Sequence, residues 1–120
     1  MSPQGRALEY ALKTIKEWEY LPYVYRVILY GSYARGDAGS RSDVDLYVEC
    51  SREIPPNELR VLRSEIIPCI PETAEVDIHF GFDELDNYDD LYHRNIRKDG
   101  LVVWEATEDI LRLQKASISI

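Results

Sequence analysis

The sequence has little cysteine, few basic residues relative to acidic ones, and no long apolar run. It contains 14 Lys and Arg residues against 22 Asp and Glu residues, which gives a formal net charge of -8. Proteins that bind the phosphate backbone of nucleic acids need an excess of positive charge. Strong nucleic-acid binding is therefore not expected. A nucleotide ligand is not excluded in this way, because divalent cations can screen carboxylates from phosphate groups.

Cysteine and apolar patterning indicate a cellular compartment. The two cysteines, Cys50 and Cys69, show no CxxC spacing, and we expect two buried free thiols rather than a disulfide. The first residues lack the charged and then apolar layout of a secretory signal. No apolar stretch approaches the roughly 20 residues that span a bilayer. We therefore expect a cytoplasmic protein with no membrane partner.

The length and the balance of residue types favour one folded domain. The chain has 120 residues, of which 45% are apolar and 30% are charged, a composition typical of a globular protein. No internal repeat, low-complexity tract or linker divides it. We expect a single domain over residues 1–120.

Apolar periodicity predicts alternating helices and strands. Helices are expected at 4–18, 57–67, 88–98 and 108–115, with a helical turn at 33–36. Strands are expected at 23–30, 43–50, 74–80 and 101–104. Asn57 is the expected N-cap of its helix, and the helix at 88–98 is expected to turn Tyr88, Leu91, Tyr92 and Ile96 inward. This order predicts an α/β (α+β) domain in which helices flank one small sheet.

Three acidic residues lie on the polar faces of two predicted strands. Asp43 and Asp45 are two positions apart, so both side chains leave the same face of one strand. Asp77 repeats the pattern on another strand, and the three carboxylates would converge if the two strands were neighbours. Hard oxygen ligands suit Mg²⁺ or Mn²⁺ rather than zinc, and two such ions can drive an in-line phosphoryl displacement. The alternative is that Asp43 and Asp45 are only solvated residues at the start of a strand.

Upstream of these acids, Gly31 and Ser32 end one strand and open a helical turn. Such a turn offers backbone N–H groups and a hydroxyl to phosphate oxygens. The alternative for Gly31 is a tight turn that has no room for a Cβ atom, which is compatible with both interpretations.

The pattern Gly31-Ser32, ten residues, and Asp43-Val44-Asp45 resembles the GS-x10-DxD signature of the DNA polymerase beta-like nucleotidyltransferase superfamily. The longer string GSYARGDAGSRSDVDLYV looks like its minimal nucleotidyltransferase branch. Asp77, within EVDIHF, matches the third acid of the family. The resemblance extends from about Leu8 to Glu105 and implies a small mixed sheet flanked by helices.

The resemblance implies a role for each matching residue. Gly31 and Ser32 would hold the β- and γ-phosphates of a nucleotide. Asp43 and Asp45 would bind two Mg²⁺ ions, with Mn²⁺ as the alternative. Asp77 would bind the second ion and help to remove the proton of the acceptor hydroxyl.

Other polar residues near the signature have weaker assignments. Arg35 would neutralise phosphate charge or stand solvated on its helical turn, and Asp37 is expected to pair with Arg35 or Arg41. His79 shares a strand face with Asp77 and would serve a structural role, tune that carboxylate or touch substrate. We expect His93 to be solvated, and we assign no catalytic role to Tyr33, which flanks the phosphate turn.

The resemblance also implies a biological setting. Members of the minimal branch are typically encoded beside a helical HEPN-type protein, and some act as antitoxins that adenylylate a tyrosine of that toxin. By resemblance, this chain would transfer AMP from ATP, or another nucleoside monophosphate from its triphosphate, to a HEPN-type partner. The alternatives are a small-molecule enzyme similar to aminoglycoside nucleotidyltransferases and an antitoxin subunit that acts by binding alone. Because no second domain closes the site, we expect a complex with the helical partner, a homo-oligomer, or both.

Overall fold

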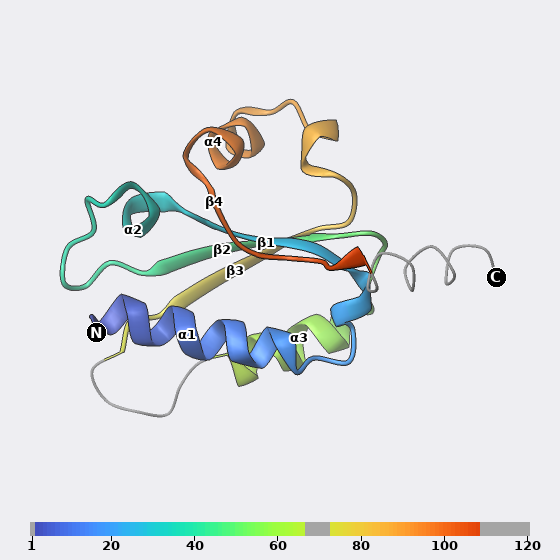
Figure 1. Ribbon diagram of the computed structural model, residues 1–120, viewed down its shortest axis with the longest axis horizontal. Coiled ribbons are helices and arrows are strands. Elements are labelled where there is room, and N and C mark those ends of the chain that lie inside the picture. The colour runs from blue at the N-terminus through green and yellow to red at the C-terminus, as the bar shows by residue number, and fades with distance from the viewer. Residues whose placement is uncertain (1, 67–72, 109–120) are drawn as a thin grey trace.

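A four-stranded mixed sheet forms the centre of the computed structural model, which describes residues 2–66 and 73–108. The strand order is β3-β2-β1-β4 (Figure 1). The strands are β1 (Val24–Tyr30), β2 (Val44–Cys50), β3 (Val76–Gly81) and β4 (Leu101–Glu105). β1 pairs antiparallel with both β2 and β4, whereas β2 and β3 run parallel. The predicted α+β class is therefore confirmed.

Helices cover both faces of this sheet. They are α1 (Pro3–Lys16), α2 (Gly31–Arg35), α3 (Pro56–Glu65) and α4 (Leu91–Asp99), with short 3-10 helices η1 (Leu21–Tyr23) and η2 (Leu85–Asn87). In Figure 1, α1 and α3 lie below the sheet, α4 lies above it, and α2 stands at one end. None of the described helices is long and apolar enough to cross a membrane.

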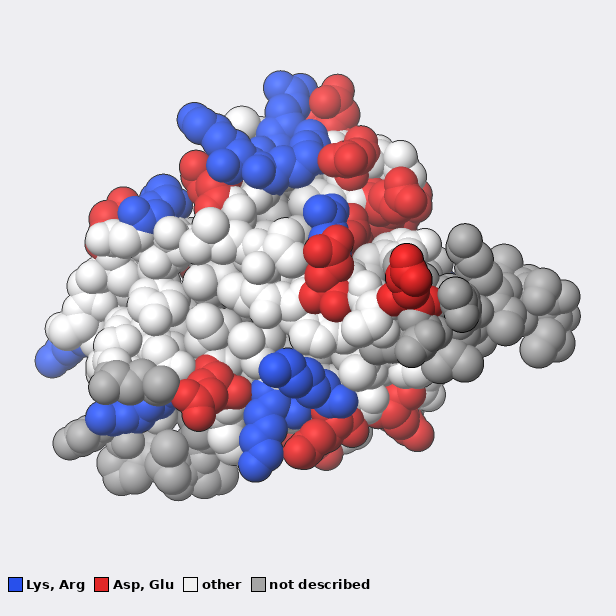
Figure 2. Space-filling model, in the orientation of Figure 1, with Lys and Arg blue, Asp and Glu red and all other residues white. Residues whose placement is uncertain are grey.

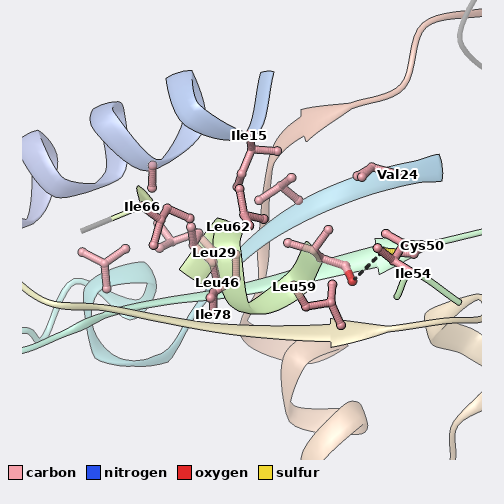
Figure 3. Packing of buried hydrophobic residues seen from close by; sticks show 14 of the residues in the cluster. Ile15, Val24, Leu29, Leu46, Cys50, Ile54, Leu59, Leu62, Ile66 and Ile78 are labelled. Carbon is pink, nitrogen blue, oxygen red and sulfur yellow. Dashed lines mark hydrogen bonds between the residues drawn. The ribbon is translucent and has the colours of Figure 1, made fainter. Parts of the chain in front are cut away.

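The main core lies between the sheet and the pair α1 and α3. Ala7, Ala11 and Ile15 recur every fourth residue along α1 and are fully buried, as one face of a helix requires. Figure 3 shows Ile15 close to the side chains of α3 and of the central strands. Ser2 caps α1 by accepting a hydrogen bond from the Gly5 N–H at 3.0 Å.

β2 is the most deeply buried strand, because both of its faces are covered. Leu46 and Val48 enter the main core. Tyr47 on the opposite face joins a second cluster with Ile28 of β1 and with Leu85 and Ile96 of the layer that contains α4. The predicted alternation of β2 is thus confirmed, but the face expected to be polar is mostly covered.

The start of α3 corrects one prediction. Asn57 is not the N-cap, because the helix begins at Pro56 and Pro55 holds the cap position without a side-chain hydrogen bond. Proline at the first helical position already has the backbone angle of a helix and lacks the N–H that a cap would satisfy. The Asn57 side chain instead accepts a hydrogen bond from Arg60 at 3.2 Å.

The start of α4 corrects a second prediction. Asp90 caps this helix by accepting a hydrogen bond from the His93 N–H, so Tyr88 precedes the helix rather than belonging to it. Leu91, the first residue of α4, is 70% exposed, and Tyr92 is 40% exposed, so neither is turned inward as predicted. Only Ile96 of the central α4 residues is buried as predicted.

Two further expectations concern residues near or beyond the described ranges. Cys50 is a free, buried thiol, as expected, whereas Cys69 lies outside the described residues. Nearly all of the helix expected at 108–115 also lies outside them.

A buried ion pair connects the sheet to the layer above it. Glu49 is only 3% exposed, and its carboxylate accepts hydrogen bonds from Arg26 Nε at 2.7 Å and Arg26 Nη2 at 3.0 Å. The Leu85 N–H donates to the same carboxylate at 2.5 Å. One carboxylate therefore joins β1, β2 and η2, and its charge is compensated by three donors.

We predict that Arg26→Met lowers the free energy of unfolding by about 2–3 kcal/mol, because it leaves a buried carboxylate without its cation. The loss falls below that of a fully enclosed pair, since the Arg26 side chain is 31% exposed. The double variant Arg26→Met/Glu49→Gln should be more stable than Arg26→Met alone, because no buried charge remains. Urea unfolding of wild type, single and double variants measures this coupling, and strictly additive losses would contradict it.

Candidate functional site

The parallel pairing of β2 and β3 places two of the predicted acids side by side. Asp45 and Asp77 are register partners across these strands, so the condition stated for their convergence, that the two strands are neighbours, is met for this pair. Asp43 lies just before β2, and its spacing from Asp45 sends it toward the same face. The Asp77 side chain is 57% exposed, on a strand at the edge of the sheet. The acidic face is therefore open to solvent at Asp77.

The three carboxylates crowd one another electrostatically. Partial burial raises the pKa of Asp45, and the charges of Asp77 and Asp43 raise it further. The charges of His79 and Arg35 act in the opposite direction. Asp45 is thus a carboxylate for which a bound cation would be strongly favourable.

Gly31 lies directly against the Asp45 side chain. Its φ is +79°, and a Cβ atom at this position would lie 2.2 Å from Asp45 Oδ2. Only glycine combines this left-handed backbone with such a close approach. The predicted helical turn is confirmed, but it begins directly at Gly31, so Ser32 and Arg35 both belong to α2.

Arg35 makes the predicted surface ion pair. Its Nε lies 3.3 Å from Asp37 Oδ2, and both side chains are well exposed. Such a pair is weak in water, so the guanidinium can exchange Asp37 for another anion. Arg35 and Gly31 also line a common cavity that reaches α4.

The two histidines differ in their surroundings. His79 Nε2 lies 3.2 Å from Asp77 Oδ2. The two residues, which were predicted to share a strand face, are therefore in contact. The expectation that His93 is solvated is wrong, because its side chain is only 18% exposed and lies 2.6 Å from Asp90 Oδ1. Its ring also stacks on Tyr88, with centroids 4.3 Å apart.

Carboxylate oxygens dominate the donors on this face. Hard oxygen donors suit Mg²⁺, and the space left by the missing Cβ of Gly31 admits the Asp45 carboxylate. Within 2–66 and 73–108, no three His, Cys, Asp or Glu side chains converge tightly enough to hold a metal ion as they stand. The backbone therefore places Asp45 and Asp77 together, and their role as a complete ligand set remains a prediction.

The sequence did not predict the aromatic cluster that lies beside the acids. Tyr30 and Tyr92 have hydroxyls 3.0 Å apart, and the Tyr92 ring centroid lies 6.0 Å from that of His79. Tyr30 is the register partner of Asp45, so this cluster adjoins the acidic face. The position of Tyr30 directly before Gly31 was the available signal, but nothing in the sequence indicates that α4 lies beside it.

Surface charge is unevenly distributed over the chain. Figure 2 shows basic side chains gathered over α4 at the top of the view, with acidic side chains over the segment beside it. Arg97 and Lys98 lie in the last turn of α4, where cations are favoured by the helix dipole. The molecule therefore offers a local basic surface despite its net charge of -8.

The glycine at the acidic face leads to a prediction with a matched control. Gly31 and Gly36 have almost the same φ, +79° and +81°, but a Cβ atom at Gly36 would meet nothing within 4 Å. We predict that Gly31→Ala and Gly36→Ala each lose about 1–2 kcal/mol of stability from the left-handed backbone. Only Gly31→Ala should also weaken Mn²⁺ binding, because its methyl group displaces the Asp45 carboxylate. Thermal unfolding and Mn²⁺ titration test the pair, and equal Mn²⁺ affinity in both variants would refute the role of Gly31.

Solved structures share this fold. A toxin–antitoxin complex with AMP-PNP contains a chain with 18% identity and a TM-score of 0.61, covering 92% of this chain and 83% of that one. The complex of the tri-AMPylated Shewanella oneidensis HEPN toxin with its MNT antitoxin gives 18% identity, a TM-score of 0.54, and coverage of 94% and 84%. The MntA-HepT toxin–antitoxin gives 16% identity, a TM-score of 0.55, and coverage of 97% and 85%. At these identities the likeness is one of fold.

No curated protein matches the sequence significantly. A family model described as "Nucleotidyltransferase domain" matches residues 9–103. This range includes the Gly31 turn and the strands that carry Asp45 and Asp77. The match covers most of the chain, and the protein belongs to the nucleotidyltransferase domain family.

Proposed function

We propose that this protein transfers AMP from ATP to a tyrosine hydroxyl of a HEPN-type partner protein and thereby acts as an antitoxin. The observation that carries the proposal is the register pairing of Asp45 with Asp77 beside the glycine turn. In the nucleotidyltransferase domain family, this arrangement supports a metal-assisted transfer from a nucleoside triphosphate.

The phosphate side of the proposed site is α2. Ser32 provides a hydroxyl, and Gly31 allows the phosphate tail to approach the backbone because it has no side chain. Arg35 adds a positive charge that its weak pair with Asp37 does not fully neutralise. Together these groups bind the β- and γ-phosphates and orient the triphosphate for transfer.

In the proposed mechanism, nucleotidyl transfer takes place at the three aspartates. Asp43 and Asp45 would hold two Mg²⁺ ions and Asp77 the second of them. When bound, these ions supply positive charge to the reacting phosphate and activate the attacking oxygen. The acceptor oxygen bonds to the α-phosphorus as pyrophosphate leaves. Asp77 receives the hydroxyl proton, and His79 orients Asp77 through their 3.2 Å contact.

The exposure of Asp77 indicates where the acceptor arrives. β3 is an edge strand, so a partner can bring a side chain to Asp77 without moving any element of this chain. Structures with the same fold contain HEPN toxins, and in one of them the toxin is AMPylated. A protein tyrosine on such a partner suits this open face better than a small molecule, which the single sheet does not enclose.

We predict that Asp43→Ala and Asp45→Ala each abolish transfer and leave the fold intact. Either change removes a metal-binding carboxylate and relieves repulsion in the metal-free site, so thermal stability should stay constant or rise. The assay incubates the protein with its genomic neighbour, Mg²⁺ and ATP labelled at the α-phosphate, and follows label on the partner. EDTA should stop the reaction.

Asp89→Ala provides the matched control, because this aspartate is 94% exposed and precedes α4. It should label the partner at the wild-type rate. Full transfer by Asp45→Ala at low Mg²⁺ would refute the proposed role of the acids. Label on a small metabolite, with none on any protein, would favour the small-molecule alternative.

We predict that Ser32→Ala reduces kcat/KM for ATP by about one to two decades without changing stability. One charge-assisted hydrogen bond to phosphate is lost, which is worth about 1.5–3 kcal/mol. Ser64→Ala is the control, since Ser64 is a helical serine on α3 whose hydroxyl donates to the Val61 carbonyl at 2.7 Å. Equal turnover in the two variants would make Ser32 a plain turn residue.

A further inference from the structure

A cavity of about 450 Å³ lies between α1 and α3. These helices cover the face of the sheet that carries the main core, so this α1–α3 groove lies on the opposite side of the sheet from the three aspartates (Figure 1). Its helical lining residues are three or four positions apart, as the residues of one helix face must be. The lining consists of Tyr10 and Thr14 of α1, Glu17, Trp18 and Glu19 at and after its C-terminal end, and Glu58, Val61 and Glu65 of α3.

Apolar side chains in the groove are open to solvent. Tyr10 is 40% exposed and Val61 is 49% exposed. The half-buried Trp18 ring is held by two aromatic neighbours, with centroid distances of 5.5 Å to Tyr20 and 6.2 Å to Phe80. Ordered aromatic side chains lose little conformational entropy when another surface covers them. The groove is therefore suited to bury apolar side chains of another molecule.

The charged residues that line the groove are all acidic. They are Glu17, Glu19, Glu58 and Glu65. Within residues 2–66 and 73–108, none of the four forms an ion pair. Burial raises the pKa of the neighbouring Tyr20 hydroxyl, and the charges of Glu58 and Glu19 raise it further. An apolar surface surrounded by uncompensated carboxylates is complementary to apolar residues flanked by Lys and Arg.

We propose that the α1–α3 groove docks a basic amphipathic helix of the protein that supplies the acceptor tyrosine. A helix fits a groove between two helices, because its apolar residues can lie along the floor while Lys and Arg on its flanks reach the glutamates. This inference rests on the proposed function. A tyrosine inserted at Asp77 makes only a small contact, whereas stable interfaces bury about 800 Å² on each partner, so the acceptor protein needs a second contact surface.

β3 connects the groove to the site of transfer. Trp18 packs against Phe80, which follows Asp77 by three residues on β3 and lies on the opposite face of that strand. Because β3 is at the edge of the sheet, one partner can reach round it and contact both faces. The groove then fixes the position of the partner, and Asp77 receives its hydroxyl. Changes in the groove therefore affect KM for the partner and leave kcat unchanged.

Binding of the full-length protein to its genomic neighbour, measured by interferometry without nucleotide, tests the groove independently of transfer. Tyr10→Ala should weaken binding roughly 10-fold, as loss of a central aromatic contact does, and Val61→Ser should weaken it by a smaller factor. Glu58→Gln/Glu65→Gln should slow association and reduce its dependence on salt, because two steering charges are lost. In the labelling assay, these variants should raise KM for the partner at constant kcat.

Two control variants make the same kinds of change on other surfaces. Val102 is 49% exposed, as Val61 is, but it belongs to β4, so Val102→Ser should bind as wild type does. Glu84→Gln/Asp86→Asn removes two exposed charges beside η2 and should also leave binding unchanged. The glutamate double variant in the groove keeps the side-chain size, which covers the case in which Tyr10→Ala fails to fold.

The outcomes separate this inference from the proposed function. Wild-type affinity in all groove variants would overturn the docking surface, and labelling with unchanged KM would do so while leaving the proposed function intact. A wild-type dimer that Tyr10→Ala converts to a monomer in light scattering would assign the groove to a second copy and overturn the inference. A partner that binds through the groove but is never labelled would overturn only the proposed function. If wild type did not bind its neighbour, both would fail.

Discussion

The parallel register of β2 and β3 is the constraint on which the rest of the site depends. It sets Asp45 beside Asp77 on adjacent strands, a pairing of like charges that disfavours the sheet locally. The pairing is held because the opposite faces of both strands carry apolar residues into the main core. Burial of Leu46, Val48 and Ile78 outweighs the repulsion of two carboxylates, one of which is mostly in water. Apolar burial on one face of the sheet therefore stabilises the strand pairing against the repulsion between the carboxylates on the other face.

The α4 layer gives the acidic face its surroundings. Without it, the upper face of the sheet would present Asp45 and Asp77 to bulk solvent with no neighbouring surface for a ligand. The Glu49 carboxylate accepts hydrogen bonds from both Arg26 of β1 and the Leu85 N–H. Ile96 and Tyr47 share a small core beneath α4. These contacts bring Tyr92 and Asn95 to the cavity beside Gly31, so a buried ion pair and a second core together create a surface next to the site.

The candidate site is exposed at the β3 edge and more enclosed on the side toward α2 and α4. The β3 edge exposes Asp77 and His79, which suits an acceptor presented by a separate protein. The side toward α2 and α4 is walled by glycine, tyrosine and arginine, which suits the nucleotide. In the proposed function, the domain holds the nucleotide itself and leaves the positioning of the acceptor to the partner.

The sequence alone predicted the α+β class, the mixed order of elements, the glycine turn and the acidic strands, because period-two alternation and glycine punctuation are local properties. It also indicated the Arg35–Asp37 pair, whose residues are two apart. It misplaced the start of α4, which is capped by Asp90. It also misjudged the environments of Leu91, Tyr92 and His93, because packing against the rest of the fold decides which helix residues are buried. Only the tertiary structure brought Tyr30, Tyr92 and Asn95 together, since strand pairing and helix packing join positions whose distance along the chain carries no periodic signal.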